Sequence, residues 1–171
     1  MQPNIHHDQS EAIIRASQAE VFAYLDDQIR LAAHMGRRSL MMLGGRMTYE
    51  FDAAQGRAVG SVIRMGGSFL GLSLSVLEVV TERTPPARKR WETRGPQSIL
   101  VIDSYVMGFD TKGVNGQTEV RVFIDYQLPT RLPGRLLGRL FAPLYARWCV
   151  SRMVNDASQH FGPDSYPAEA A

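Results

Sequence analysis

Two aspartates interrupt apolar stretches of this sequence, and a carboxyl group placed among apolar side chains is suited to proton transfer. Burial raises the pKa of such a group towards the range in which it acts as a general acid or base. If these stretches are strands, Asp103 shares the phase of the apolar positions and of Tyr105, so its side chain is expected to point inwards. Asp125 is out of phase with Tyr126 and is expected to face solvent. Asp103 is therefore the catalytic candidate, and a surface carboxylate paired with an arginine is its alternative interpretation.

A second group of side chains has the chemistry of an apolar binding site. Aromatic rings offer large apolar surfaces, and tyrosine hydroxyls can orient a polar group of a ligand. The residues expected to line such a site are Tyr49, Met65, Trp91, Tyr105, Met107, Tyr126, Phe141, Tyr145 and Trp148. Further adaptable contacts are expected from Met35, Met41 and Met42. All these assignments depend on strand phase, in which an error of one residue turns each side chain to the other face.

Other kinds of chemistry leave no motif in the sequence. Histidines occur without metal-binding spacing, and no Cys-x-x-Cys, His-Glu-x-x-His or phosphate-binding glycine loop is present. Cys149 is the single cysteine, which excludes an intrachain disulfide, fits a reducing setting and indicates a small buried hydrophobe. We therefore expect neither a metal nor a cofactor, and no catalytic motif identifies the chain as an enzyme.

The composition is typical of a single soluble domain. The sequence is 44% hydrophobic and 21% charged, and its formal net charge of +2 is too small to indicate a nucleic-acid partner. Residues 1–10 lack the pattern of a signal peptide, and the longest uncharged apolar stretch, Gly66–Leu77, is far shorter than the ~20 residues of a membrane helix. We expect a cytoplasmic monomer or homodimer with no integral membrane segment. The expected domain spans residues 10–161, between flexible segments at 1–9 and 162–171.

The elements that would position these residues follow a simple order. A strand at Ala12–Ala16 runs into a helical stretch at Ser17–Met35, and a long amphipathic helix at Pro133–Phe161 closes the domain. Strands separated by turns are expected between the helices, at Arg46–Asp52, Val59–Met65, Phe69–Thr81, Arg88–Arg94, Ile99–Phe109 and Thr118–Leu128. An antiparallel sheet with one apolar face needs a cover, and here the last helix must supply it. Such an arrangement favours an internal cavity between sheet and helix.

The first helical stretch carries two start signals. Ser17 and Glu20 have the spacing of a capping box, in which each side chain bonds to the backbone amide of the other residue. Asp26 and Asp27 then suggest a second N-cap, so the stretch is expected to contain two short helices.

The last helix allows three interpretations. In the first interpretation, an apolar stripe along its first half is the part of the core that covers the sheet. This stripe consists of Leu136, Leu137, Leu140, Phe141, Leu144 and Trp148. Alternatively, Phe141, Tyr145 and Trp148 line a cavity. In the third interpretation, the leucines and the neighbouring side chains of Arg131, Arg135, Arg139 and Arg147 mark a membrane surface. Pro143 predicts a kink or a restart of the helix.

The start of the domain resembles a known superfamily. Residues 14–27, Ile-Arg-Ala-Ser-Gln-Ala-Glu-Val-Phe-Ala-Tyr-Leu-Asp-Asp, are similar to the strand, capping residue and aromatic helix that open START-like (SRPBCC) proteins. The resemblance covers essentially residues 10–161. It implies an α+β helix-grip fold, in which a curved seven-stranded antiparallel sheet wraps around a long C-terminal helix and two short helices follow the first strand. The superfamily includes lipid-transport proteins, polyketide cyclases/dehydrases and quinone-binding proteins, and it offers no shared catalytic motif to carry over.

These observations lead to three hypotheses of function. The first is binding or transport of a hydrophobic small molecule, such as a lipid, a quinone or a polyketide-like ring system, in the internal cavity. The second is a cyclase or dehydratase in which Asp103 activates a carbon acid while Tyr105 or Tyr126 donates a hydrogen bond. The third is peripheral contact with a membrane or a protein partner through the arginine-bearing last helix.

Overall fold

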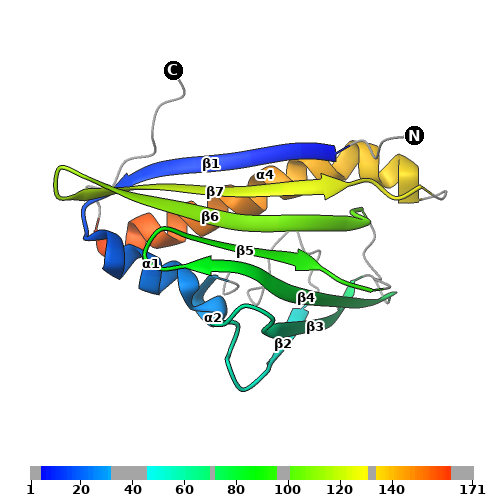
Figure 1. The fold of residues 1–171 in the computed structure, drawn as a ribbon. Coiled ribbons are helices and arrows are strands. Elements are labelled where there is room, and N and C mark those ends of the chain that lie inside the picture. Colours follow the sequence, from blue (N-terminus) through cyan, green and yellow to red (C-terminus); the bar gives the residue numbers. More distant parts are fainter. Residues whose placement is uncertain (1–4, 32–45, 70–71, 96–100, 131–133, 163–171) are drawn as a thin grey trace.

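The computed structural model describes residues 5–31, 46–69, 72–95, 101–130 and 134–162. Three helices occur within them, α1 (Gln18–Asp26), α2 (Gln28–Leu31) and α4 (Gly134–Phe161). The strands are β1 (Ile5–Ile14), β2 (Arg46–Phe51), β3 (Val62–Phe69), β4 (Leu72–Thr84), β5 (Arg88–Thr93), β6 (Ser104–Val114) and β7 (Gln117–Gln127). Figure 1 shows one sheet with α4 running behind it and with α1 and α2 at one end.

The strands form a single antiparallel sheet in the order β1-β7-β6-β5-β4-β3-β2. From β2 to β7, each strand pairs with the next one in the chain, so short turns suffice to connect them. β1 instead joins the far edge of the sheet, where Ile5 pairs with Gln127 and Ile14 with Thr118. The seven-stranded helix-grip architecture predicted from the sequence is confirmed.

Both start signals in the first helical stretch are confirmed. The Ser17 side chain and the Glu20 carboxylate form the predicted capping box at the start of α1. Asp27 ends α1, and its Oδ1 accepts hydrogen bonds from the amides of Ile29 and Arg30 in the first turn of α2. The stretch is therefore two short helices, as the paired aspartates indicate.

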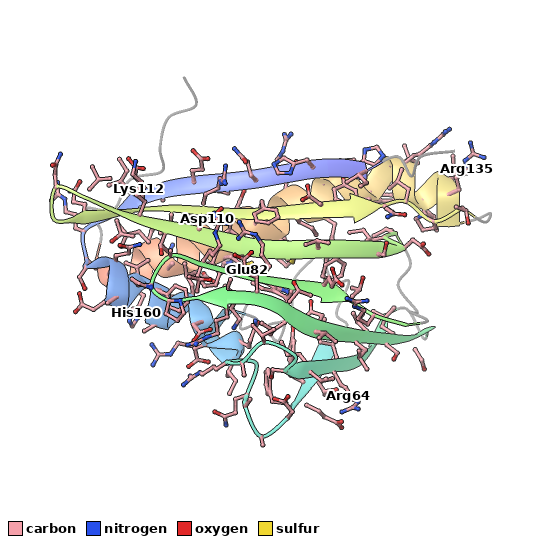
Figure 2. All side chains as sticks on the ribbon, viewed as in Figure 1. Arg64, Glu82, Asp110, Lys112, Arg135 and His160 are labelled. Carbon is pink, nitrogen blue, oxygen red and sulfur yellow. The ribbon has the colours of Figure 1, made fainter. Side chains whose placement is uncertain are left out.

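The outer face of the sheet carries charged side chains, which are included in Figure 2. Asp110 on β6 accepts hydrogen bonds from Arg90 and Arg121 on the two neighbouring strands, each at 2.8 Å. The inner face is apolar and packs against α4, which lies mainly on β1 and β7. This division between the two faces is typical of an antiparallel sheet with one covered side.

The face of α4 that contacts the sheet differs from the predicted one. In its first half the buried residues are Gly138, Ala142 and Ala146. A Cβ at Gly138 would lie 2.9 Å from the carbonyl oxygen of Val101 and 3.0 Å from Cδ of Pro129, so the helix approaches its neighbours too closely for large side chains. The leucine-rich stripe therefore faces away, and the prediction that it forms the core is wrong. α4 is also one continuous helix through Pro143, so it does not restart there.

Candidate functional site

A buried carboxyl group lies on the inner face of the sheet. The side chain of Glu78 on β4 points to the same face of the sheet as those of Val76 and Val80, and Glu78 is only 4% exposed. The Tyr105 hydroxyl donates a hydrogen bond to Oε1 of Glu78 at 2.5 Å, and the Trp91 side chain also bonds to this carboxyl group. Burial raises the pKa of Glu78 to about 7, although these hydrogen bonds lower it. The carboxyl group can therefore exchange a proton near neutral pH.

Side chains from β2 and α4 complete the surroundings of Glu78. Tyr49 interacts electrostatically with Glu78, Tyr145 and Cys149, and burial is the main cause that raises the pKa of its phenol. Burial likewise raises the pKa of Tyr145, and it raises that of the Cys149 thiol to about 12. A thiol with this pKa carries almost no thiolate at neutral pH, so Cys149 acts as a small apolar residue, as predicted.

The hydroxyl of Tyr49 is the unusual atom of this cluster. It is buried and has no hydrogen-bond partner in the part of the chain that the structure describes. Buried polar groups nearly always have a partner, and an unpartnered one costs about 1–3 kcal/mol. As far as the described residues show, the hydroxyl is therefore an unoccupied hydrogen-bonding position beside a titratable carboxyl group.

The buried cation nearest to this cluster is already paired. Lys89 on β5 is fully buried and lowers the pKa of Glu78 electrostatically. Its Nζ contacts Oδ1 of Asp26 at 2.9 Å and donates to the backbone oxygen of the same residue at 3.1 Å. Arg83 binds the other side of the Asp26 carboxylate at 2.8 Å. The three side chains join the end of α1 to β4 and β5.

A groove lies at one end of β5, β6 and β7. It has a volume of about 230 Å³ and is lined by residues from β5, β6 and β7 together with Ile5 of β1. Tyr105 and Tyr126 both line it. Tyr105 therefore belongs both to the lining of the groove and to the hydrogen-bond partners of Glu78.

The structure brings together four of the predicted binding residues and separates others from them. Tyr49, Trp91, Tyr105 and Tyr145 surround Glu78 from four different elements. Two more predicted residues are buried in the apolar core, Met65 and Met107. Met35, Met41 and Met42 lie outside the described residues.

The remaining three predicted residues lie elsewhere. Tyr126 is buried, but its hydroxyl points to β1, where it donates to Oδ2 of Asp8 at 3.4 Å. Trp148 is partly buried against the core. Phe141 is 50% exposed on the outer side of α4, because the small residues of that helix face the sheet.

The predicted inward orientation of Asp103 is wrong. Asp103 is exposed and precedes β6, which begins only at Ser104, so the strand phase assumed for it does not apply. Asp125 is partly exposed, as expected, and its carboxylate contacts Nδ1 of His7 at 2.6 Å.

Glu78 was missed, although the sequence contains a signal for it. Ser73 and Ser75 alternate with apolar residues along β4, which predicts that Glu78 lies on the apolar face.

Two other kinds of site find no support in the described residues. Within them, no cluster of three or more histidine, cysteine, aspartate or glutamate side chains could hold a metal ion. Among the described helices, none is both long and apolar enough to cross a membrane.

Comparisons with known proteins identify the fold. No protein-family model matches the sequence, and no curated protein sequence matches it. A Thermus thermophilus protein, TTHA0849, has a similar structure, with a TM-score of 0.65, 18% identity, and coverage of 91% of this chain and 97% of that one.

Norcoclaurine synthase from Thalictrum flavum, solved with dopamine and hydroxybenzaldehyde, gives a TM-score of 0.62 at 13% identity, with 92% and 87% of the two chains covered. The di-domain ARO/CYC protein BexL gives a TM-score of 0.63 at 17% identity, and the match covers 98% of this chain and 51% of that one. At these identities the likeness shows the fold alone, which is the helix-grip fold predicted from the sequence.

Proposed function

We propose that this chain binds a largely apolar small molecule that carries at least one polar group, between the inner face of the sheet and α4. The observation that carries this proposal is the Tyr49 hydroxyl, which is buried without a hydrogen-bond partner in the described part of the chain. A ligand oxygen bonded to this hydroxyl would remove the cost of leaving it unpartnered. Trp91, Tyr105 and Tyr145 supply the aromatic surface expected beside a ring or an acyl chain.

The class of ligand follows from the surrounding groups. At neutral pH, a Glu78 carboxyl group with a pKa of about 7 can either donate or accept a hydrogen bond. Carbonyl and hydroxyl oxygens on an apolar skeleton fit such a pair of partners, which is the chemistry of quinones, polyketide-like rings and oxygenated lipids. Norcoclaurine synthase, which shares the fold, was solved with two aromatic small molecules, and this supports an aromatic ligand here.

The test removes the Tyr49 hydroxyl alone. In Tyr49→Phe we expect apolar ligands with a carbonyl or hydroxyl group, such as naphthoquinones, to bind about tenfold more weakly, since one hydrogen bond is lost. The free protein should become more stable by about 1–3 kcal/mol, because an unpartnered buried hydroxyl disappears. Titration by Trp fluorescence and urea denaturation measure the two effects.

Tyr24→Phe is the matched control, because the Tyr24 hydroxyl lies on α1 and donates to the backbone oxygen of Asp156. This variant should bind the same ligands as tightly as the wild type does. Equal affinity of the wild type and Tyr49→Phe for every probe, or native mass spectra and titrations without any ligand, would contradict the proposal.

A second candidate function is proton transfer by Glu78, in an enzyme of the cyclase or dehydratase type. The observation that favours it is the raised pKa of this carboxyl group, because a general base works best when its pKa lies near the working pH. Tyr105 would hold the carboxyl group in place and donate a hydrogen bond to it. In this proposal Glu78 takes the role that the sequence suggested for Asp103.

Kemp elimination of 5-nitrobenzisoxazole tests this candidate without knowledge of the natural substrate. A desolvated carboxylate accelerates this reaction, so the wild type should show a rate that rises through a pKa near 7. Glu78→Gln should reduce the rate to background, whereas Asp103→Asn should leave it unchanged. A rate that survives in Glu78→Gln would rule out Glu78 as the base.

A further inference from the structure

The exposed large apolar residues of this protein are concentrated on one helix face. Among the described residues, nine large hydrophobic side chains are exposed, and five of them lie within the first half of α4. They are 37–61% exposed and comprise Leu136, Leu137, Leu140, Phe141 and Leu144. The other four, which lie singly on β1, α2 and the β2–β3 connection, are Ile5, Ile13, Ile29 and Val59. We call the five residues on α4 the apolar ridge.

The apolar ridge lies opposite the buried face of the helix. Gly138, Ala142 and Ala146 pack towards the sheet, and the ridge positions recur at spacings of three and four residues on the other side. The ridge is therefore a convex surface formed by one helix rather than a groove between elements. A row of leucines with a phenylalanine on one helix face is the apolar half of the pattern by which helices lie in a membrane interface.

As far as Asn155, the charged side chains of α4 are all positive. Residues 134–155 contain four arginines and no aspartate or glutamate. Arg135, at the N-terminal end of α4 in Figure 2, and Arg139 are both exposed. The Arg147 side chain is 78% exposed, and its ion pair with Asp8 is long, at 3.7 Å. Long arginine side chains beside an apolar ridge can reach upwards to negative groups at the level of lipid headgroups.

We propose that the apolar ridge docks on an anionic membrane surface, with the leucines and Phe141 at the level of the acyl chains and the arginines at the headgroups. A second copy of this chain is the less favourable occupant, because two ridges face to face would bring the arginines of both helices together. The proposal concerns the outer side of α4 and does not depend on a ligand on its inner side.

Vesicle sedimentation tests the proposal directly. The full chain should bind vesicles of phosphatidylcholine with one third phosphatidylglycerol about tenfold more tightly than vesicles of phosphatidylcholine alone. Added salt should reduce this difference, because it screens exposed charges. Leu140→Ser/Phe141→Ser and Arg135→Glu/Arg139→Glu should each weaken binding to the anionic vesicles about tenfold or more.

The matched control is Ile29→Ser/Val59→Ser, which removes two equally exposed apolar side chains from other elements. It should bind vesicles as the wild type does, and the circular dichroism spectra of all variants should match. Depth can be measured with Phe141→Trp, whose fluorescence brominated lipids should quench more strongly than that of Ile29→Trp.

Two outcomes would overturn the proposal. One is that the wild type does not sediment with anionic vesicles at low salt, or that the ridge variants bind as well as it does. The other is that the wild type is a dimer in solution which Leu140→Ser/Phe141→Ser converts to monomers, because the ridge is then an interface between two copies.

Discussion

At the scale of single residues, the Glu78 carboxyl group is the feature on which both functional proposals depend. It is buried among aromatic rings, and only the Tyr105 hydroxyl and the Trp91 side chain are identified as its hydrogen-bond partners among the described residues. When a carboxylate is buried in such surroundings, the two hydrogen bonds do not replace all of the hydration energy that it loses. The pKa is therefore raised to about 7, and the neutral form prevails below that pH. The fold thus keeps a group whose charged form it tolerates poorly, which is typical of a functional position.

This raised pKa makes the stability of the protein depend on pH. In the unfolded chain Glu78 ionises near its ordinary pKa of 4.5, whereas in the folded protein it holds its proton until about pH 7. The folded state therefore binds more protons across this window, and the free energy of unfolding falls as the pH rises through it, by about 3 kcal/mol for this shift.

The corresponding prediction concerns Glu78→Gln, which keeps the shape of the side chain and cannot ionise. Urea denaturation of both proteins from pH 4 to pH 8 should show that the wild type loses about 3 kcal/mol relative to this variant. The control Glu119→Gln, which alters an exposed carboxylate on β7, should follow the wild type. Parallel curves for the wild type and Glu78→Gln would mean that the carboxyl group titrates in the folded protein as it does in the unfolded chain.

At the scale of elements, the end of α1 is attached to the sheet by charge. Asp26 accepts hydrogen bonds from Lys89 and Arg83, and although burial opposes its ionisation, these bonds hold its pKa below the ordinary value. Lys89 is fully buried, so its ammonium group depends on this carboxylate. A helix of nine residues has little stability of its own, and this attachment fixes where it covers the sheet.

We predict that Asp26→Asn destabilises the protein by about 3–5 kcal/mol, because the variant leaves Lys89 charged and buried without a carboxylate. The double variant Asp26→Asn/Lys89→Met should recover a large part of this loss. The control Asp156→Asn breaks the ion pair with Arg152, which is partly exposed, and should cost about 1 kcal/mol or less. Thermal or urea denaturation measures the stability of all three variants. If Asp26→Asn and Asp26→Asn/Lys89→Met lose the same free energy of unfolding, the explanation is contradicted.

α4 shows what element-scale patterns can and cannot predict. Its helical spacing and its extent follow from the sequence, because apolar residues recur every three to four positions between Pro133, near its start, and the Gly162-Pro163 pair that follows its last residue. The buried face does not follow, since two stripes compete. Hydrophobicity favours the leucines, but the close approach at Gly138 admits only a small side chain. That approach depends on where Val101 and Pro129, which lie outside the strands, are placed in the folded protein.

At the scale of the whole molecule, the sequence predicted the fold well because many local signals agree. The capping box at Ser17, the paired aspartates and the alternation along β7 each specify one step of the same architecture.

The candidate site was predicted less completely. Tyr49 and Trp91 were found because their strands alternate clearly. The start of β6 was instead placed five residues too early, at Ile99 instead of Ser104, and this gave Asp103 the wrong orientation. Contacts across several strands, such as that between Tyr105 and Glu78, have no signature in one stretch of sequence.

The position of β1 at the far edge of the sheet has a consequence for how the chain reaches its folded state. The other pairings join strands that are neighbours in sequence, so each can form as soon as its hairpin is made. β1 pairs only with β7, and more than one hundred residues separate Ile14 from Thr118. During synthesis, β1 must therefore wait until nearly all of the other strands of the sheet are made before its partner is available. Because closing so long a loop costs entropy before it brings contacts, the docking of β1 and α4 is expected to be the late, slow event of folding.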